Sequence, residues 1–211
     1  MMLASRTGAW SGKRLPYDAE VEWIGKGISG NYIDTGVEVL PDTHYQIKSR
    51  LSTSNEKTEN YAIGQTVILS NTCCAGAYFN RDSLRIGYRS NSAASKSVDL
   101  SGINEYFADY QPNIQTISVN GSVVVRASQA SVIAGGGNIA IGKRGTYEAS
   151  DYTKYYYISI IVDGKLVRDL IPVRFTNGDG VSEGAMYDKV SGQLYRNAGT
   201  GEFLIGPDKT T

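Results

Sequence analysis

The sequence predicts an all-β protein, a two-sheet antiparallel sandwich or jelly roll, and three observations lead to that prediction. Short segments alternate between apolar and polar residues, and Asn-Gly and Asp-Gly pairs separate neighbouring segments. No long stretch keeps the 3.6-residue period of an amphipathic helix. The composition, with 24 Gly, 15 Tyr and 4 Phe, is typical of many short strands joined by tight turns.

The alternation is clearest over residues 44–51, which read HYQIKSRL. One face of this predicted strand carries Tyr45, Ile47 and Leu51. The opposite face carries His44, Gln46, Lys48 and Arg50. A period of two with one polar face indicates a strand that turns one side to the core, so His44 is predicted to be exposed. Residues 155–162 read YYYISIIV and are apolar on both faces, which favours a central strand.

Two hairpins are predicted from turn chemistry. The pairs Asn120-Gly121 and Asp163-Gly164 each separate two apolar segments. Asn, Asp and Gly tolerate the positive φ angles of type I′ turns, whose twist matches that of a hairpin. The only helical signal is weak: residues 104–110, NEYFADY, are interpreted as one short turn of helix.

The chain divides into a short arm and one domain. Residues 1–16 are polar and lack periodicity, so they are predicted to form an N-terminal arm, and residues 17–211 the jelly-roll sandwich domain. The arm lacks the continuous apolar segment of a secretory signal. No run approaches the roughly 20 apolar residues that span a bilayer. We therefore expect no membrane insertion.

Charge and cysteine content argue against several classes of function. The 21 Lys and Arg balance 21 Asp and Glu, so the formal net charge is zero. Nucleic-acid binding needs cations that neutralise phosphates, and no basic stripe supplies them. The two cysteines, Cys73 and Cys74, are adjacent, which is neither a disulfide framework nor the spacing of zinc ligands. They are interpreted as reduced thiols.

The two ends of the domain carry a more specific pattern. The chain reads EVEWIGKGISGNYIDTGV over residues 20–37, DGKLVRDLIPVRF over 163–175, and GAMYDKVSGQLYRNAGTGEFLIGPD over 184–208. These stretches resemble the ends of laminin-G-like, concanavalin A-like jelly-roll domains found in phage tail and fibre proteins and in gut-bacterial surface proteins. The resemblance implies one sandwich whose first and last strands lie close together.

Two residues of this pattern have a predicted structural role. Pro172 lacks a backbone N–H, so we expect it to end the hydrogen bonding of its strand. Asp188 has a short carboxylate that accepts nearby backbone N–H bonds, so we expect it to cap the turn at residues 189–192.

The sequence shows no catalytic set, and we predict that the protein is not an enzyme. Neither a nucleophile elbow, G-x-S-x-G, nor the E-x-D-x-x-E carboxylates of related jelly-roll glycosidases occur. Glu20 and Glu22 share a strand face but are interpreted as solvated. No metal site is predicted. Some laminin-G-like domains bind calcium, and Asp179 with Asn177, or Asp151 with Glu148, could contribute oxygen ligands. Neither pair supplies enough ligands on its own, so calcium binding remains only an alternative.

Aromatic residues give the best indication of a binding site. Sugars stack on aromatic faces and bond to flanking polar groups. The candidate ligand-binding residues are Tyr106, Tyr110, Tyr147, Tyr152, Tyr155 and Tyr156. The alternative is that these tyrosines cover an edge of the sandwich or lie in an oligomer interface.

The resemblance implies a function in adhesion. We expect a non-enzymatic phage structural or adhesion protein, a head, tail-fibre or decoration component of the virion, that displays a lectin-like jelly roll to host glycans. The alternative is a carbohydrate-binding surface module of a gut bacterium. The arm is predicted to attach to other proteins of the assembly, with Trp10 as its anchor. The alternative is that residues 1–16 are only a disordered tail. A homo-oligomer, such as a trimer, is expected.

Overall fold

A computed structural model describes most of the chain. The described residues are 15–27, 30–38, 40, 43–50, 60–65, 75–80, 83–88, 92–97, 105–111, 114–128, 137–144, 147–148 and 153–210. For the strands between residues 60 and 97, only the backbone is described. Most of the predicted arm, including Trp10, and both cysteines lie outside the described residues.

The larger sheet is entirely antiparallel. Its strands are β1 (Ala19–Glu20), β2 (Ile24–Gly25), β4 (His44–Arg50), β9 (Glu105–Tyr110), β10 (Ile114–Val119), β11 (Ser122–Ser128), β15 (Lys154–Val162), β16 (Lys165–Thr176), β17 (Ser182–Asp188), β18 (Gln193–Tyr195) and β19 (Leu204–Ile205). They follow the order β11-β10-β9-β4-β15-β16-β17-β18, with β1 paired to β16, β2 to β15 and β19 to β2.

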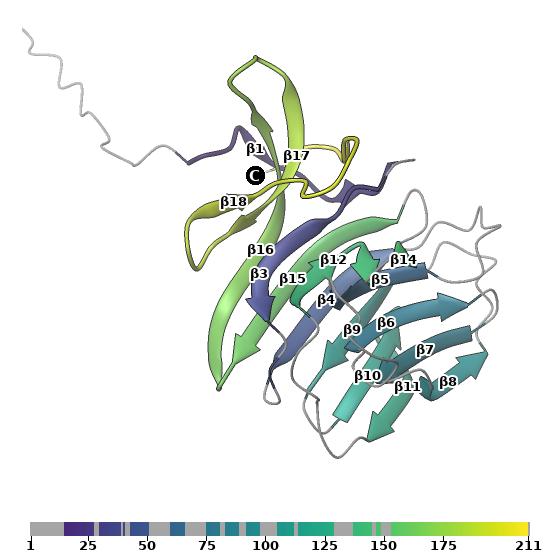
Figure 1. The fold of residues 1–211 in the computed structure, drawn as a ribbon. Coiled ribbons are helices and arrows are strands. Elements are labelled where there is room, and N and C mark those ends of the chain that lie inside the picture. The colour runs from purple at the N-terminus through teal and green to yellow at the C-terminus, as the bar shows by residue number, and fades with distance from the viewer. Residues whose placement is uncertain are drawn as a thin grey trace, which may run out of the picture.

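A smaller antiparallel sheet lies over the larger one (Figure 1). Its strands are β3 (Ile33–Glu38), β5 (Asn60–Gln65), β6 (Ala75–Asn80), β7 (Ser83–Tyr88), β8 (Ser92–Ser97) and β12 (Asn138–Ile141), in the order β3-β12-β5-β6-β7-β8. A separate pair is formed by β13 (Lys143–Arg144) and β14 (Tyr147–Glu148). The chain passes repeatedly between the two large sheets, as in a jelly roll. This confirms the predicted all-β, two-sheet antiparallel sandwich.

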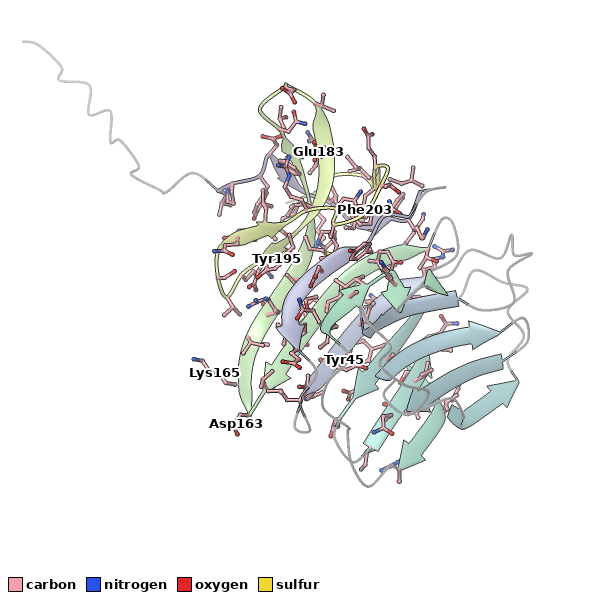
Figure 2. The ribbon with its side chains drawn as sticks, in the orientation of Figure 1. Tyr45, Asp163, Lys165, Glu183, Tyr195 and Phe203 are labelled. Atoms are coloured by element: carbon pink, nitrogen blue, oxygen red, sulfur yellow. The ribbon has the colours of Figure 1, made fainter. Side chains whose placement is uncertain are left out.

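The core lies between the two sheets. The larger sheet contributes Tyr45, Ile47, Ala108, Ile117, Ile158, Ile160 and Leu170, and the smaller sheet Ile33, Ile139 and Ile141, all at most 1 % exposed. Tyr45 lies in this space in Figure 2. Burying apolar side chains stabilises the fold by about 25 cal/mol for each Å² removed from water. The predicted alternation of residues 44–50 is confirmed.

The central position predicted for residues 155–162 is also confirmed, since β15 lies between β4 and β16. Its pattern contains a bulge that the sequence did not reveal. Tyr155 pairs with Ser49, but Tyr157 pairs with Lys48, so Tyr156 is the extra residue. A bulge shifts the alternation by one. Tyr155 and Ile158 therefore both face the core, and Tyr157 faces away from it.

Both predicted hairpins are present. Asn120 and Gly121 have φ angles of 48° and 82°, and Asp163 and Gly164 have 50° and 68°. Two successive positive φ angles define the type I′ turn. They join β10 to β11 and β15 to β16, and Figure 2 shows Asp163 and Lys165 at the tip of the second hairpin.

The helical turn predicted at residues 104–110 is wrong, because residues 105–110 form β9. This strand pairs with β4 on one side and β10 on the other, so sheet pairing overrides the weak local preference. The described residues contain no helix. None of them, accordingly, forms a helix long and apolar enough to cross a membrane.

The prediction that Pro172 ends its strand is also wrong, since β16 continues to Thr176 and pairs with β17 throughout. The carbonyl of Pro172 accepts a hydrogen bond from the Val21 N–H at 3.1 Å. In a strand, the N–H and C=O of one residue point to the same side. On this side of β16, the pairing with β15 ends at Leu170 and the pairing with β1 begins next to Pro172. The missing N–H of Pro172 therefore faces the place where one partner strand ends and the next begins.

The two ends of the domain are joined, as the resemblance implied. Strand β2 pairs with β19, and Val21 forms a bridge with Asp208. The Glu22 N–H donates to the Pro207 carbonyl at 2.9 Å. Arg174 of β16 adds an ion pair with Asp208 at 2.7 Å. In Figure 1 the C-terminus lies beside β1 and β17.

Candidate functional site

A row of polar side chains crosses the outer face of the larger sheet, which we define as the face turned away from the smaller sheet. Asp109 of β9 is paired with Gln46 of β4, Gln46 with Ser159 of β15, and Ser159 with Asp169 of β16. We call these four residues the polar row. Neighbouring strands lie about 4.8 Å apart, so the row is about 14 Å long. The Ser159 hydroxyl donates to Gln46 Oε1 at 3.2 Å.

At one end of the polar row, His44 and Asp109 form a close pair. His44 Nε2 lies 2.6 Å from Asp109 Oδ1, and Gln111 Nε2 donates to Asp109 Oδ2 at 3.1 Å. The two side chains of the pair are only 21 % and 18 % exposed. His44 is on the polar face, as predicted, but the expectation that it is exposed is wrong, because it pairs across to β9. Burial raises the pKa of Asp109, but the hydrogen bonds from His44 and Gln111 outweigh it, so that pKa lies below its ordinary value.

This pair predicts an acid-dependent part of the stability. The pKa of Asp109 is lower in the folded chain than in the unfolded chain, where an aspartate titrates near pH 3.9. The pair therefore stabilises the fold above about pH 4, and this contribution disappears as the pH falls through the folded pKa. Asp109→Asn should cost on the order of 1 kcal/mol at pH 7 and progressively less below pH 4. Urea unfolding across that range measures the difference, and a difference that stays constant contradicts the prediction.

Aromatic and charged side chains flank the polar row. Lys48 forms an ion pair with Glu105 at 2.8 Å, with both side chains nearly half exposed, and its Nζ lies 5.7 Å from the ring centroid of Tyr156. Burial raises the pKa of Tyr156, although a hydrogen bond with Arg50 works against it. Burial likewise raises the pKa of Tyr157, whose hydroxyl bonds with Ser159 and Asp169. These half-buried rings lie among groups that donate and accept hydrogen bonds.

The outer face continues into an apolar cluster on β16 and β17. The cluster consists of Ile171, Val173, Phe175 and Ala185, covered by Tyr17, Tyr157, Tyr187 and Leu194. The rings of Tyr17 and Tyr187 lie 4.9 Å apart at an angle of 60°. Tyr17 precedes β1, so the chain crosses this face before it enters the sheet. Tyr157 belongs both to this cluster and to the surroundings of the polar row, so the cluster holds its ring in place.

The structure separates the six candidate tyrosines. Tyr156 lies half-buried on the outer face beside the polar row. Tyr155 is 0 % exposed and packs in the core, which removes its ring from any surface. Tyr106 and Tyr110 lie in β9 and Tyr147 in β14, but their side chains, and the whole of Tyr152, lie outside the described residues.

Sequence reasoning missed most of the outer-face site. The polar face of residues 44–50 was visible, because its alternation is regular. The partners Asp109, Ser159 and Asp169 come from three other strands, and only the register of the sheet shows that they form a row. Placing Tyr157 on the outer face requires knowing that Tyr156 forms a bulge. The sequence does not show this bulge, because it lies in a run of three tyrosines.

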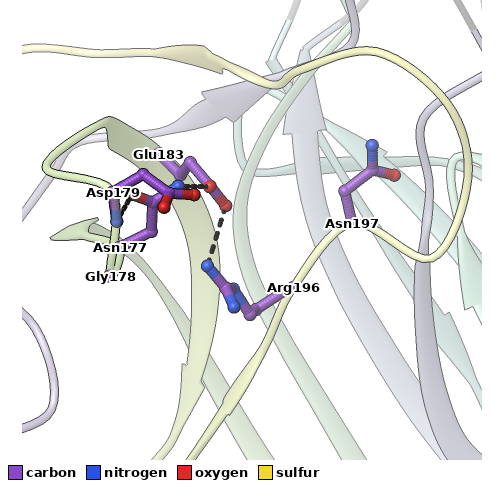
Figure 3. Close-up of a pocket in the computed structure, with 6 residues that line it drawn as sticks. All are labelled: Asn177, Gly178, Asp179, Glu183, Arg196 and Asn197. Atoms are coloured by element: carbon purple, nitrogen blue, oxygen red, sulfur yellow. Dashed lines mark hydrogen bonds and ion pairs between the residues drawn. The ribbon is translucent and has the colours of Figure 1, made fainter.

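A second polar feature is an open pocket between the β16–β17 turn and the segment after β18 (Figure 3). Its volume is about 410 Å³, and it is lined by Asn177, Gly178, Asp179, Glu183, Arg196 and Asn197. The Glu183 carboxylate accepts hydrogen bonds from Asn177 Nδ2 and, at 3.2 Å, from Arg196 Nη2. The Arg196 guanidinium also lies 4.4 Å from the ring centroid of Phe175.

The oxygens of this pocket are poorly suited to calcium. Asn177 Oδ1 already accepts hydrogen bonds from the backbone N–H groups of Asp179 and Val181, each at 2.9 Å. Both Glu183 oxygens are also engaged, and Arg196 brings a positive charge. Calcium takes six to eight oxygen ligands, and here only the Asp179 carboxylate is unengaged. Across the described part of the chain, no three His, Cys, Asp or Glu side chains gather as a metal site.

The outer-face carboxylates are spaced too widely for glycosidase chemistry. Glu105 and Asp109 are four residues apart on β9, or about 13 Å along the strand. Asp109 and Asp169 lie about 14 Å apart across the sheet. Glycosidases hold their two carboxyl groups about 5 to 9.5 Å apart. The close pairs hold Asp109 toward His44 and Glu105 toward Lys48.

Comparison with known proteins adds little to this geometry. No protein-family model matches the sequence, and no curated protein matches it. Among solved structures, the chain is similar to one described as a mutant of Trypanosoma rangeli sialidase displaying trans-sialidase activity, with a TM-score of 0.43 and 11% sequence identity. The match covers 56% of this chain and 20% of that chain. A likeness at this level carries no argument about function.

Proposed function

We propose that the protein is a non-enzymatic β-sandwich module that binds a glycan on the outer face of its larger sheet. The observation that supports this most is the polar row, in which Gln46, Asp109 and Asp169 are partly exposed on either side of the buried Ser159, with half-buried tyrosine rings beside them. A sugar presents hydroxyl groups that need such donors and acceptors, and C–H surfaces that pack on aromatic rings. Both kinds of group lie within neighbouring strand positions.

The site is fixed before a ligand arrives. Its side chains stand on four adjacent strands, and contacts within the protein hold three of them in place: Asp109 by His44, Gln46 by Ser159, and Tyr157 by the apolar cluster. Side chains that are already ordered lose little conformational entropy on binding. A rigid strand scaffold also holds binding groups more accurately than a loop.

The biological setting is proposed from the sequence. The pattern at residues 20–37, 163–175 and 184–208 resembles laminin-G-like, concanavalin A-like domains, and supports a role as a fibre, head or decoration component of a virion. A surface module of a gut bacterium is the alternative. In either setting we propose that residues 1–16 attach the domain to its assembly, that Trp10 is the anchor, and that the protein is a homo-oligomer.

Glycan-array screening followed by calorimetry of the strongest ligand tests the binding function. Gln46→Ala and Tyr156→Ala should each weaken binding at least about tenfold, because a lost hydrogen bond or ring contact costs about 1.4 kcal/mol. Asp179→Ala, in the pocket of Figure 3, is the matched control and should leave the affinity unchanged. If Asp179→Ala abolishes binding and the other two do not, the pocket is the site. If no glycan binds, the proposed function is wrong.

A further inference from the structure

Two cations lie directly opposite each other on the outer face, beyond the polar row. Arg50 of β4 is in register with Lys154 of β15, and we call these two residues the cation pair. Both side chains point to the outer face, because their neighbours Ser49 and Tyr155 are 0 % exposed and point to the core. Directly opposed residues of an antiparallel pair have Cβ atoms about 5 Å apart, and like charges in that position destabilise a sheet. The strand pairing alone therefore gives no reason for the cation pair.

No carboxylate of the described residues compensates the cation pair. Glu105 of β9 is in register with Arg50 on its other side, but its carboxylate pairs with Lys48 at 2.8 Å. No other described carboxylate lies within ion-pair distance of Arg50 or Lys154. The described side chains of β4, β9 and β15 at this end are thus three cations, Lys48 and the cation pair, and one acid, Glu105. Two positive charges are left in excess.

Aromatic side chains hold the cation pair in place without neutralising it. Lys154 Nζ lies 3.9 Å from the ring centroid of Trp23, and an ammonium over a ring keeps its charge. Arg50 is hydrogen-bonded to the Tyr156 hydroxyl, whereas its Nε is buried without a partner. A guanidinium has five N–H donors, more than one hydroxyl can satisfy. Both side chains are partly exposed, so a ligand from solvent can reach them.

We propose that the cation pair binds an acidic group, a carboxylate or a sulfate, of the glycan that lies along the outer face. This rests on the proposed glycan-binding function. An anion between the two side chains accepts charge-assisted hydrogen bonds from both and offsets their mutual repulsion. Arg50 is four residues beyond Gln46 on β4, or about 13 Å along the strand. A ligand that reaches both is therefore an oligosaccharide, with hydroxyl groups at the polar row and its acid at the cation pair.

Paired glycans test this specificity directly. Neutral oligosaccharides are compared with their uronic, sialylated and sulfated counterparts by calorimetry at low and high salt. At low salt the wild-type protein should bind an acidic member at least about tenfold more tightly, and the advantage should shrink as salt screens the charges. A preference for either kind of acid supports the inference and identifies the group. Neutral members that bind as tightly as the acidic ones overturn the inference and leave the proposed function standing. Failure of every glycan to bind overturns both.

Charge variants test whether the cation pair causes the preference. Lys154→Gln and Arg50→Gln should each lower the ratio of acidic to neutral affinity at least about fivefold, because each removes one charged donor. Lys165→Gln is the matched control: it removes the same charge from an exposed side chain at the tip of the β15–β16 hairpin (Figure 2) and should leave the ratio unchanged. If Lys165→Gln lowers the ratio equally, overall charge sets the preference and the inference is wrong. A ratio that stays constant in both Lys154→Gln and Arg50→Gln overturns it as well.

Discussion

Replacing Asp188 with alanine should destabilise the protein by about 3–5 kcal/mol, because a buried carboxylate is removed from the hydrogen-bond donors that surround it. Asp188 is 0 % exposed. It accepts hydrogen bonds from the Asp169 N–H at 2.8 Å, the Val190 N–H at 3.1 Å, and both the N–H and hydroxyl of Ser191, at 3.3 and 2.7 Å. Urea or thermal unfolding measures the loss, which corresponds to about 10 °C or more in Tm for a chain of this size.

The effect should spread beyond the turn because Arg168 depends on the same carboxylate. Arg168 Nη1 lies 3.8 Å from Asp188 Oδ2, and the guanidinium also donates through Nε to the Thr35 carbonyl at 3.0 Å. Its Cζ lies 5.1 Å from the ring centroid of Tyr195. Asp188 and Arg168 thus connect β3 of one sheet to β16, β17 and β18 of the other. Among the described residues Arg168 forms no ion pair with another acid, so without the carboxylate its positive charge, on a side chain only 20 % exposed, would have no acidic partner there.

Two further variants separate charge from position. Asp188→Asn keeps the shape but loses the charge and one acceptor, so it should lie between wild type and Asp188→Ala. Asp179→Ala removes an exposed carboxylate from the neighbouring turn and should change stability by less than about 0.5 kcal/mol. If Asp188→Ala lowers the free energy of unfolding by less than about 1 kcal/mol, water replaces the carboxylate, and the hydrogen bonds to Asp188 contribute little to the stability of the fold.

Asp188 also shows which part of the fold could be read from the sequence. The cap of the turn at residues 189–192 was predicted, and so were the two type I′ hairpins, because these depend on residues a few positions apart. The joining of the first and last strands was implied by the resemblance of both ends. Three expectations failed, the helical turn at 104–110, the strand end at Pro172 and the exposure of His44, and each failed where a neighbouring strand supplies the partner. Local preference does not contain that information.

The candidate site was less predictable than the fold for the same reason. The polar face of β4 followed from alternation, but a row across four strands requires the register of each pair. The bulge at Tyr156 moves Tyr157 to the outer face and Tyr155 into the core, so an even alternation misplaces one of them. A bulge of one residue leaves no compositional trace in a run of tyrosines. The contact between Arg168 and Asp188, twenty positions apart in sequence, was equally invisible.

Gly199→Ala is the second substitution for which we expect a large effect, a loss of about 2–3 kcal/mol. A Cβ at this position would lie 1.9 Å from the Gly30 carbonyl oxygen and 2.9 Å from Cδ1 of Tyr32. The first neighbour is backbone, so no side-chain rotation relieves the overlap. The loop must move away from the segment before β3, which breaks the hydrogen bonds from Ala198 N to the Tyr32 carbonyl at 2.9 Å and from Thr200 N to the Gly30 carbonyl at 3.3 Å.

Hydrogen exchange shows where this loss is located. The amides of Ala198 and Thr200 should exchange faster in Gly199→Ala, whereas amides of β4 and β9 should keep their protection, because the strain lies where the C-terminal loop meets the N-terminal segment. Gly178→Ala is the control, since a Cβ there has nothing within 4 Å, and it should stay within about 0.5 kcal/mol of wild type. Equal stabilities for the two variants would show that the loop moves aside at no cost. In that case its contacts with residues 30–32 would not hold the two ends of the chain together.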